Sequence, residues 1–126
     1  MNAILTQKAP EPIGPYSQAI AAGQMIFCSG QIPLIPGEKS LSIEGIREQT
    51  VQALENLREV LSAGHSSFSQ VVKTTIYLTD MNHFPACNEV YESYFSAPFP
   101  ARSCVGVAAL PKGALIEIEA IAIQQS

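Results

Sequence analysis

Charged side chains are scarce in this sequence. Only 14% of its 126 residues are Asp, Glu, Lys or Arg, whereas 47% are hydrophobic; ordinary soluble domains contain about 25% charged residues. A chain of this length is expected to form one domain, residues 1–126, that buries about two-thirds of its unfolded surface. Because so few charges cover the remaining surface poorly, we expect apolar surface to be buried against further copies of the chain.

Basic clusters and long apolar runs are also missing. The 7 Lys and Arg are scattered and outnumbered by 11 Asp and Glu, giving a formal net charge of −4, which argues against nucleic acid binding. No apolar run approaches the ~20 residues that cross a membrane, and the N-terminus shows no secretory signal core.

Three cysteines cannot all pair within one chain, and no CxxC motif occurs. We interpret Cys28, Cys87 and Cys104 as reduced thiols in a cytoplasmic protein.

The order of predicted elements indicates an α+β fold. The proline-rich start of the chain, with Pro10, Pro12 and Pro15, is expected to be extended and turning. One helix is expected between an N-cap at Ser42 and a stop at Gly64, and a second over residues 82–95. Strands are predicted over residues 17–22, 24–29, 71–79, 101–110 and 115–124. The order β, β, α, β, α, β, β predicts one sheet with both helices packed on one face.

Arg102 is the only arginine outside the first predicted helix. Strand alternation places it on the same face as Cys104 and Gly106. A guanidinium in a strand needs a partner, because an unpaired buried charge is costly. Two interpretations remain open at this point: a structural ion pair with a carboxylate of the sheet, or a fork that binds the carboxylate or phosphate of a ligand.

Glu117 and Glu119 are unusual acids within the apolar segment LIEIEAIAI. They share one face of the last predicted strand and lie ~6.6 Å apart along it. One carboxylate is expected to pair with Arg102 or Lys73, and the other to carry a proton in a reaction. Paired carboxylates also serve glycoside hydrolysis, but there they flank a sugar-binding cleft rather than share one strand.

The other reactive residues indicate no further chemistry. His65 and His83 lack partners at the spacing of metal ligands, so no metal site is predicted. Cys104 offers a thiol nucleophile, although a small buried cysteine in a strand more often serves packing. The glycines form neither a GxGxxG nor a P-loop pattern, which argues against a nucleotide site.

Four segments closely resemble the RidA (YjgF-type) reactive-intermediate deaminase family. They are IGPYSQA at residues 13–19, CSGQIP at 28–33, PARSCV at 100–105 and IEIEAIA at 116–122. Segment VVKTT at residues 71–75 and the helical residues 88–95 also resemble this family. The resemblance covers nearly the whole chain in order, which makes it far more specific than any single motif.

The resemblance implies a chorismate-mutase-like α+β fold with a single mixed sheet, assembled as a homotrimer whose active sites lie between subunits. It implies a 2-iminobutanoate/2-iminopropanoate deaminase, which hydrolyses enamines and imines such as 2-aminoacrylate and 2-iminobutyrate to 2-keto acids and ammonia. Neither a metal nor another cofactor is implied. The expected partners are these small carboxylates and further copies of the chain.

The resemblance also assigns roles to individual residues. Arg102 is expected to clamp the substrate carboxylate, which supplies the partner that its strand position requires. Glu117 is expected to activate the attacking water or relay a proton to the departing nitrogen, whereas Glu119 is assigned to structure. The other residues are expected to bind substrate, with Cys104 acting through its backbone: Tyr16, Ser29, Asn88 and Cys104.

Other interpretations stay open at this level. Tyr16 could only anchor the proline-rich arm, Ser29 only satisfy a strand end, and Asn88 only pack at the helix interface. Some relatives are described as endoribonucleases or translation inhibitors, but the acidic net charge of this chain argues against RNA binding. A protein that binds a small carboxylate through Arg102 without turnover would use the same pocket. Gly106 stands where many relatives carry a larger residue, which could either open the pocket floor or alter the trimer seam; such a departure bears on substrate range more than on reaction type.

Overall fold

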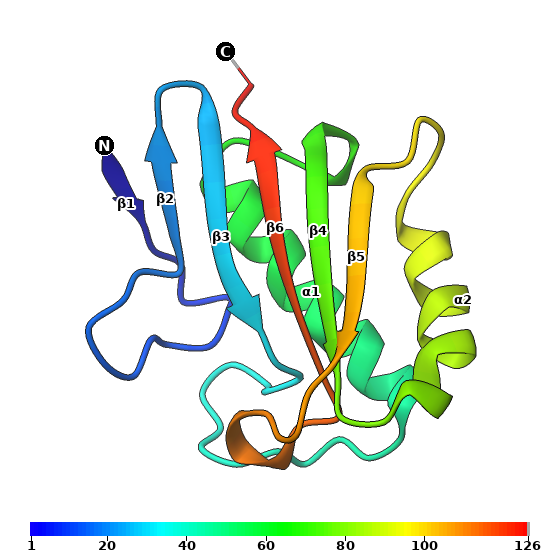
Figure 1. Ribbon diagram of the computed structural model, residues 1–126. Helices are drawn as coiled ribbons and strands as arrows, with labels where there is room; N and C mark the ends of the chain where they lie inside the picture. Colours follow the sequence, from blue (N-terminus) through cyan, green and yellow to red (C-terminus); the bar gives the residue numbers. More distant parts are fainter. Residues whose placement is uncertain (126) are drawn as a thin grey trace.

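Six short strands and two helices build the fold (Figure 1). The computed structural model describes residues 1–125 and places these six strands in one sheet. The strands are β1 (Asn2–Ile4), β2 (Ala19–Ala22), β3 (Met25–Gln31), β4 (Val71–Leu78), β5 (Ala101–Gly106) and β6 (Ile116–Ile123). The helices are α1 (Ile46–Ala63) and α2 (Phe84–Tyr94), accompanied by the 3₁₀ turns η1 (Phe68–Gln70), η2 (Met81–His83) and η3 (Pro111–Gly113).

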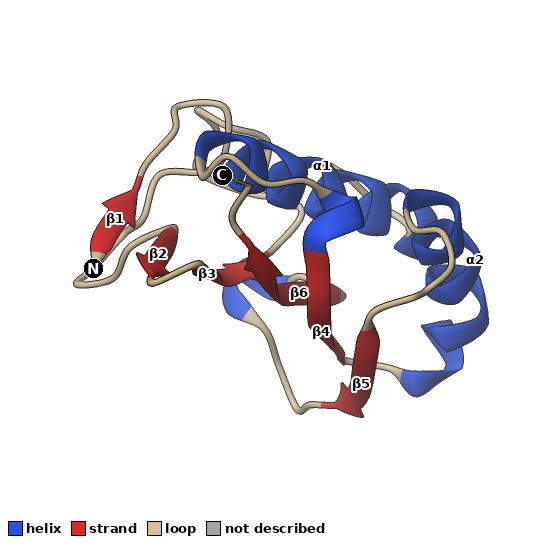
Figure 2. Ribbon diagram, turned by 90° about the horizontal axis from the view of Figure 1, so that it is seen from above, coloured by secondary structure: helices blue, strands red, loops and turns tan. Residues whose placement is uncertain are grey.

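The sheet is mixed, with the strand order β1-β2-β3-β6-β4-β5. β4 and β5 run parallel, and the other neighbouring pairs are antiparallel. The parallel pair arises because α2 carries the chain from the end of β4 back to the start of β5. Both helices cover the same face of the sheet (Figure 2). The predicted single sheet with two helices on one face is therefore confirmed.

Several element boundaries differ from the predicted ones. α1 begins after Gly45, whose φ of 87° suits glycine and interrupts a helix, so the predicted N-cap at Ser42 is wrong. Ser42 instead donates its hydroxyl hydrogen bond to Glu38. β5 ends at Gly106 rather than at residue 110, because its partner β4 ends at Leu78.

The second helix and the last strand are also slightly shorter than predicted. α2 starts only after η2, where Asp80 accepts a hydrogen bond from the N–H of Asn82. It ends at Tyr94 because Phe95 adopts an extended conformation, whereas Pro85 lies in the first turn as predicted. β6 loses one residue at each end of its predicted range. β1 is not among the predicted strands.

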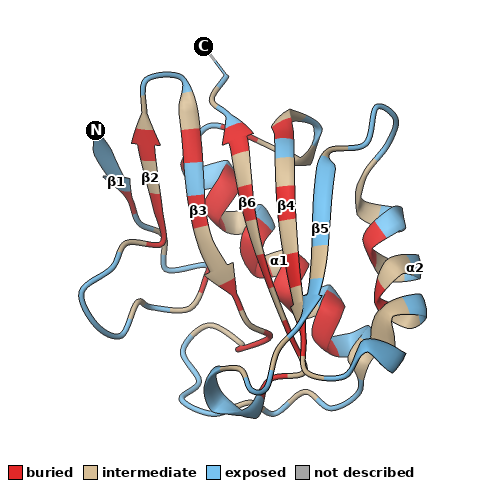
Figure 3. Ribbon diagram, in the orientation of Figure 1, coloured by how far each residue is buried: buried red, intermediate tan, exposed pale blue. Residues whose placement is uncertain are grey.

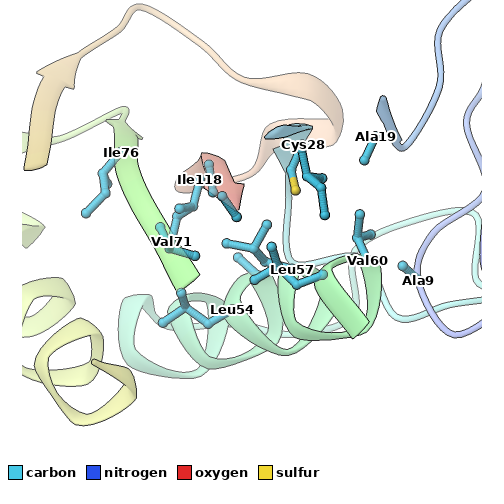
Figure 4. Packing of buried hydrophobic residues seen from close by; sticks show 14 of the residues in the cluster. Ala9, Ala19, Cys28, Leu54, Leu57, Val60, Val71, Ile76 and Ile118 are labelled. Atoms are coloured by element: carbon cyan, nitrogen blue, oxygen red, sulfur yellow. The ribbon is translucent and has the colours of Figure 1, made fainter. Parts of the chain in front are cut away.

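The hydrophobic core lies between the sheet and α1. Alternate residues of β6 are buried against the helices, as the bands along this strand in Figure 3 show: Ile116, Ile118, Ala120 and Ala122. Leu54, Leu57 and Val60 of α1 belong to the same buried cluster (Figure 4). Because side chains alternate along a strand, Glu117 and Glu119 lie on the opposite face of the sheet.

That opposite face is covered by neither α1 nor α2 (Figure 2). Strand register places Tyr77 of β4 beside Glu117 of β6 and beside Val105 of β5. Val105 is 42% exposed on this face, and Phe27 of β3 is 46% exposed. The uncovered face therefore carries both acidic and large apolar side chains.

Two buried amides fasten the loops that flank the sheet. The Gln18 side chain accepts a hydrogen bond from the N–H of Thr6 at 2.7 Å and donates one to the carbonyl of Pro10 at 2.9 Å. Asn56 of α1 donates to the segment that follows β3, including the Leu34 carbonyl at 2.8 Å. These bonds hold two segments that line a cavity of about 580 Å³ beside the sheet.

Candidate functional site

A cavity of about 580 Å³ opens where β3 and β6 meet the N-terminal segment. Its volume lies in the range of small-molecule sites, about 300–1,000 Å³. Three residues that the sequence predicts for the site line it together: Tyr16, Ser29 and Glu117. The wall also includes Gly30, Lys112 and Glu119.

Glu117 occupies its position because Gly30 leaves room for it. A Cβ atom added at Gly30 would lie 2.7 Å from the Cδ of Glu117, a separation that real Cβ atoms do not tolerate. Burial first, and then the charge of Glu119, raise the pKa of Glu117 above its ordinary value of 4.5. A carboxyl whose pKa moves toward neutrality is suited to proton transfer.

Glu119 is held by Tyr77 of the neighbouring strand. The Tyr77 hydroxyl donates a hydrogen bond to Oε1 of Glu119 at 2.5 Å, within the range for a hydroxyl on an ionised carboxylate, about 2.5–2.7 Å. This hydrogen bond, followed by burial and the two carboxylates, raises the pKa of Tyr77 to about 12. No pattern in the sequence marks Tyr77 as a site residue, because a tyrosine within a strand is ordinary.

Tyr16 and Ser29 are placed differently in the cavity wall. Ser29 donates its hydroxyl hydrogen bond to the Ser17 carbonyl at 2.6 Å, which satisfies a neighbouring strand end. The Ser29 oxygen keeps its capacity to accept a hydrogen bond from a ligand. Tyr16 is 54% exposed and lies on the N-terminal segment that Gln18 fastens. Gln18 also lines the cavity, although it is not among the site residues predicted from the sequence.

Arg102 lies at a second cavity of about 390 Å³, which it lines together with Asn88 of α2. Nη1 of Arg102 donates a hydrogen bond to Oδ1 of Asn88 at 2.7 Å. The guanidinium also lies over the rings of Phe84 and Tyr91, with Cζ 5.3 and 4.9 Å from their centroids. The Asn88 amide and the two rings orient the guanidinium, whose other N–H groups can bind an anion through two parallel hydrogen bonds.

The ion pair predicted between Arg102 and a carboxylate of the sheet is wrong. Within residues 1–125, neither Arg102 nor Lys73 forms an ion pair with Glu117 or Glu119; the ion pairs join helix residues instead. The alternative interpretation of Arg102, a fork that binds a ligand, therefore gains weight.

Strand register explains why this ion pair does not form. Thr74 of β4 pairs with Arg102 on one side and with Ala120 on the other, and both Thr74 and Ala120 are buried beneath the helices. Tyr77, the register partner of Glu117, faces the other way. One chain therefore holds the predicted site residues in two groups: Tyr16, Ser29 and Glu117 on the uncovered face, and Asn88 and Arg102 on the helix side.

Cys104 lies on the helix side of β5 and packs against the core. Burial raises the pKa of its thiol, and the nearby Arg102 counteracts only part of that rise. A thiol that keeps its proton is a weak nucleophile, so the packing interpretation is favoured. Burial likewise raises the thiol pKa of Cys28 to about 12 and that of Cys87 to about 11. All three thiols are free.

The two histidines lie away from both cavities. His65 follows α1 with a φ of 59°, and His83 lies in η2; neither lines a cavity described above. In the described part of the chain, no three His, Cys, Asp or Glu side chains gather closely enough to hold a metal ion. No helix within residues 1–125 combines the length and the apolar character needed to cross a bilayer.

The family is identified by comparison with known proteins. The family model described as Endoribonuclease L-PSP matches residues 6–124, nearly the whole chain. The chain belongs to this family, that of the RidA (YjgF-type) proteins. The resemblance found in the sequence is thereby confirmed.

Individual RidA-family relatives match over almost their full length. The human protein named 2-iminobutanoate/2-iminopropanoate deaminase is 51% identical over 121 residues, covering 96% of this chain and 88% of that protein. The crystal structure of E. coli TdcF with bound serine has a TM-score of 0.93 at 41% identity, covering 99% of this chain and 100% of that one. RidA from an Antarctic Psychrobacter bacterium has a TM-score of 0.93 at 41% identity, covering 98% and 99%.

Proposed function

We propose that this RidA-family chain is a deaminase that hydrolyses enamines and imines such as 2-aminoacrylate and 2-iminobutyrate to 2-keto acids and ammonia. The observation that carries the proposal is Arg102, an oriented guanidinium at a cavity wall without a carboxylate partner among residues 1–125. The 51% identity to the human protein named 2-iminobutanoate/2-iminopropanoate deaminase supports the substrate class. Serine, present in the TdcF structure, also carries a carboxylate beside a nitrogen-bearing carbon.

Arg102 binds the carboxylate of the substrate through two parallel N–H donors. Asn88 and the rings of Phe84 and Tyr91 keep the fork in one orientation. A carboxylate fixed in this way also fixes the adjacent C=N carbon relative to the attacking water. Because an imine carbon is already electrophilic, this positioning supplies much of the acceleration.

Glu117 moves the protons in this reaction. Its carboxylate takes a proton from the attacking water and passes it to the imine nitrogen, as the water oxygen bonds to the carbon. It then takes the proton of the new hydroxyl group and passes it to the same nitrogen, so that the C–N bond breaks and the C=O bond forms. Ammonia and a 2-keto acid leave. The raised pKa of Glu117 suits a group that alternately takes and gives a proton.

The complete site forms between copies of the chain, in a homotrimer of chorismate-mutase-like fold. Arg102 of one copy faces Glu117 of the next, because a single chain holds them on opposite faces of its sheet. The exposed Phe27 and Val105 on the uncovered face support burial against another copy. The low charge content of the sequence supports it as well.

The other predicted residues complete this pocket. Tyr16 closes its rim, and Ser29 accepts a hydrogen bond from the substrate nitrogen with its free lone pair. Cys104 contributes its backbone rather than its sulfur, since its thiol keeps its proton. Neither a metal nor another cofactor takes part in these steps.

An imine generated in place tests the proposal. A threonine dehydratase supplies the unstable imine, and semicarbazide traps whatever survives. Wild-type protein should lower the amount of trapped imine, whereas Arg102→Ala should not, with unchanged fold and oligomeric mass. Arg47→Ala is the matched control, because Arg47 is an exposed arginine paired with Glu89 outside both cavities. A folded wild-type protein that leaves trapping unchanged overturns the proposal and points to ligand binding without turnover.

Endoribonuclease activity, which the family description names, is not proposed for this chain. Its net charge of −4 opposes the phosphate contacts that dominate RNA binding. The two histidines, which would serve as an acid–base pair, line neither cavity.

A further inference from the structure

The cavity beside β6 contains a second acid that the proposed reaction does not use. Glu119 lies on the same face of β6 as Glu117, ~6.6 Å further along the strand, and both line the cavity. Tyr77 reaches across from β4 and donates its hydroxyl hydrogen bond to Glu119 at 2.5 Å. Such a short, charge-assisted bond fixes the carboxylate in place.

We propose that Glu119, anchored by Tyr77, is a positioning residue that holds a negative charge beside Glu117 and so sets the pH at which Glu117 exchanges its proton. The inference rests on the proposed deaminase function and extends it by two residues. It replaces the purely structural role predicted for Glu119 from the sequence.

The strand geometry favours this coupling. Tyr77 is the register partner of Glu117, yet its hydroxyl bonds to the next acid along the strand. Gly30 closely adjoins the Glu117 side chain on the β3 side. Glu119 is therefore held by a neighbouring strand, and Glu117 lies against Gly30 of the strand on the other side, so that both carboxylates lie on the same face of the sheet.

Other polar groups face Glu117 from each element around it. β3 contributes Ser29, Gly30 and Gln31, which carry no charge, and the N-terminal segment contributes Glu11 and Tyr16. From η3, Lys112 lines the cavity, but its Nζ donates to the Lys39 carbonyl at 2.7 Å. On β4, Lys73 lies on the same face but pairs in register with Ile121, beyond Glu119. Among these groups of its own chain, Glu119 is the one whose charge raises the pKa of Glu117, in addition to burial; the Arg102 proposed to face Glu117 from the next copy would lower that pKa, and it is unchanged in the variants compared below.

The direction of the effect follows from like-charge repulsion. A fixed negative charge disfavours ionisation of a nearby carboxyl, so its removal should let Glu117 ionise at lower pH. The acidic limb of the kcat/KM profile reports this ionisation in the free enzyme, because Glu117 must be ionised to accept a proton from water.

Glu119→Gln tests the proposal directly. The amide has nearly the same size and still accepts the hydrogen bond from Tyr77, but it carries no charge. The acidic limb should move to lower pH by about 0.5–1 unit. Glu44→Gln is the control, since it removes the same charge from an exposed residue outside both cavities and should leave the limb in place. An unshifted limb in folded Glu119→Gln overturns the proposal.

Tyr77→Phe tests the anchor. Without the hydroxyl the Glu119 carboxylate is released, so the limb should move in the same direction as in Glu119→Gln. The double variant should show no shift beyond that of Glu119→Gln alone, because Tyr77 acts through Glu119. Additive shifts would contradict this order of action.

A measurement independent of activity separates this inference from the proposed function. The Glu117 carboxyl can be titrated by NMR in protein labelled with ¹³C-glutamate and assigned through Glu117→Gln. A titration that moves to lower pH in Glu119→Gln supports the coupling even if the wild-type protein is inactive. An unmoved titration overturns it even if the protein is an active deaminase.

Discussion

Arg102 and Glu117 project from opposite faces of one sheet, although only β4 lies between their strands. Arg102 shares its side with the buried Thr74 and is held by Asn88 of α2, whereas Glu117 shares its side with Tyr77. In the proposed reaction, the carboxylate clamp and the proton carrier would therefore come from two copies of this chain.

Mixing two nearly inactive variants tests this consequence. Arg102→Ala and Glu117→Gln should each lose nearly all activity alone, but subunits mixed in equal amounts should regain activity after unfolding and reassembly. In a closed ring with one site between each pair of neighbours, about a quarter of the sites then combine an intact Arg102 with an intact Glu117. The measurement is deaminase activity of the mixed sample relative to wild type refolded in the same way.

The control for this experiment mixes the two variants without unfolding, which should leave activity near zero until subunits exchange. Mixtures that stay inactive after verified reassembly would show that both residues act within one chain.

Glu117→Gln should slow turnover but stabilise the fold. Since burial raises the pKa of Glu117, the folded state binds its proton more tightly than the unfolded chain does. At pH values well below 4.5, the ordinary pKa of the carboxyl, Glu117 is protonated in both the folded and the unfolded chain, and its burial does not reduce the free energy of unfolding. As pH rises through the folded-state pKa, the buried carboxyl ionises and the free energy of unfolding falls. The variant should melt at a higher temperature than wild type at pH 7, and the difference in melting temperature should vanish near pH 4.

The turnover of Glu117→Gln should fall by about 10²-fold or more, while binding of 2-oxobutyrate is retained. Unchanged turnover would assign the proton transfers to another group.

Gly30→Ala should impair activity while hardly affecting stability. The new methyl group would collide with the carboxyl end of Glu117, which is flexible and can move aside at little energetic cost. A displaced proton carrier should reduce kcat by about 10- to 100-fold, with a melting temperature close to that of wild type. Because the effect passes through Glu117, Gly30→Ala combined with Glu117→Gln should be no slower than Glu117→Gln alone. A variant as active as wild type would mean that the position of Glu117 is not critical.

Cys104→Ser should retain most of the activity. Burial keeps the Cys104 thiol protonated, and its proposed contribution comes from the backbone, which serine reproduces. Because the thiol is protonated, iodoacetamide should alkylate Cys104 slowly at pH 7, and mass spectrometry can measure the rate. Complete loss of turnover in a folded Cys104→Ser protein would restore the thiol as a nucleophile.

Local patterns in the sequence predict most of the fold. The apolar stripe before Gly64 corresponds to α1, and the alternation around Glu117 corresponds to β6, whose buried residues face α1. The errors occur where the outcome depends on one backbone conformation or on a distant partner. Gly45 interrupts the helix predicted from Ser42, and the three residues of β1 form a strand only because they pair with β2.

The sequence by itself determined the family, the order of all helices and strands except β1, and the identity of the residues with unusual chemistry, since these are encoded in local motifs and periodicities. Only the tertiary structure decided how those residues are grouped. The separation of Arg102 from Glu117, the fit of Glu117 beside Gly30 and the bond from Tyr77 to Glu119 all depend on register between strands that are distant in the sequence. A shift of one residue in that register would turn each side chain to the other face of the sheet.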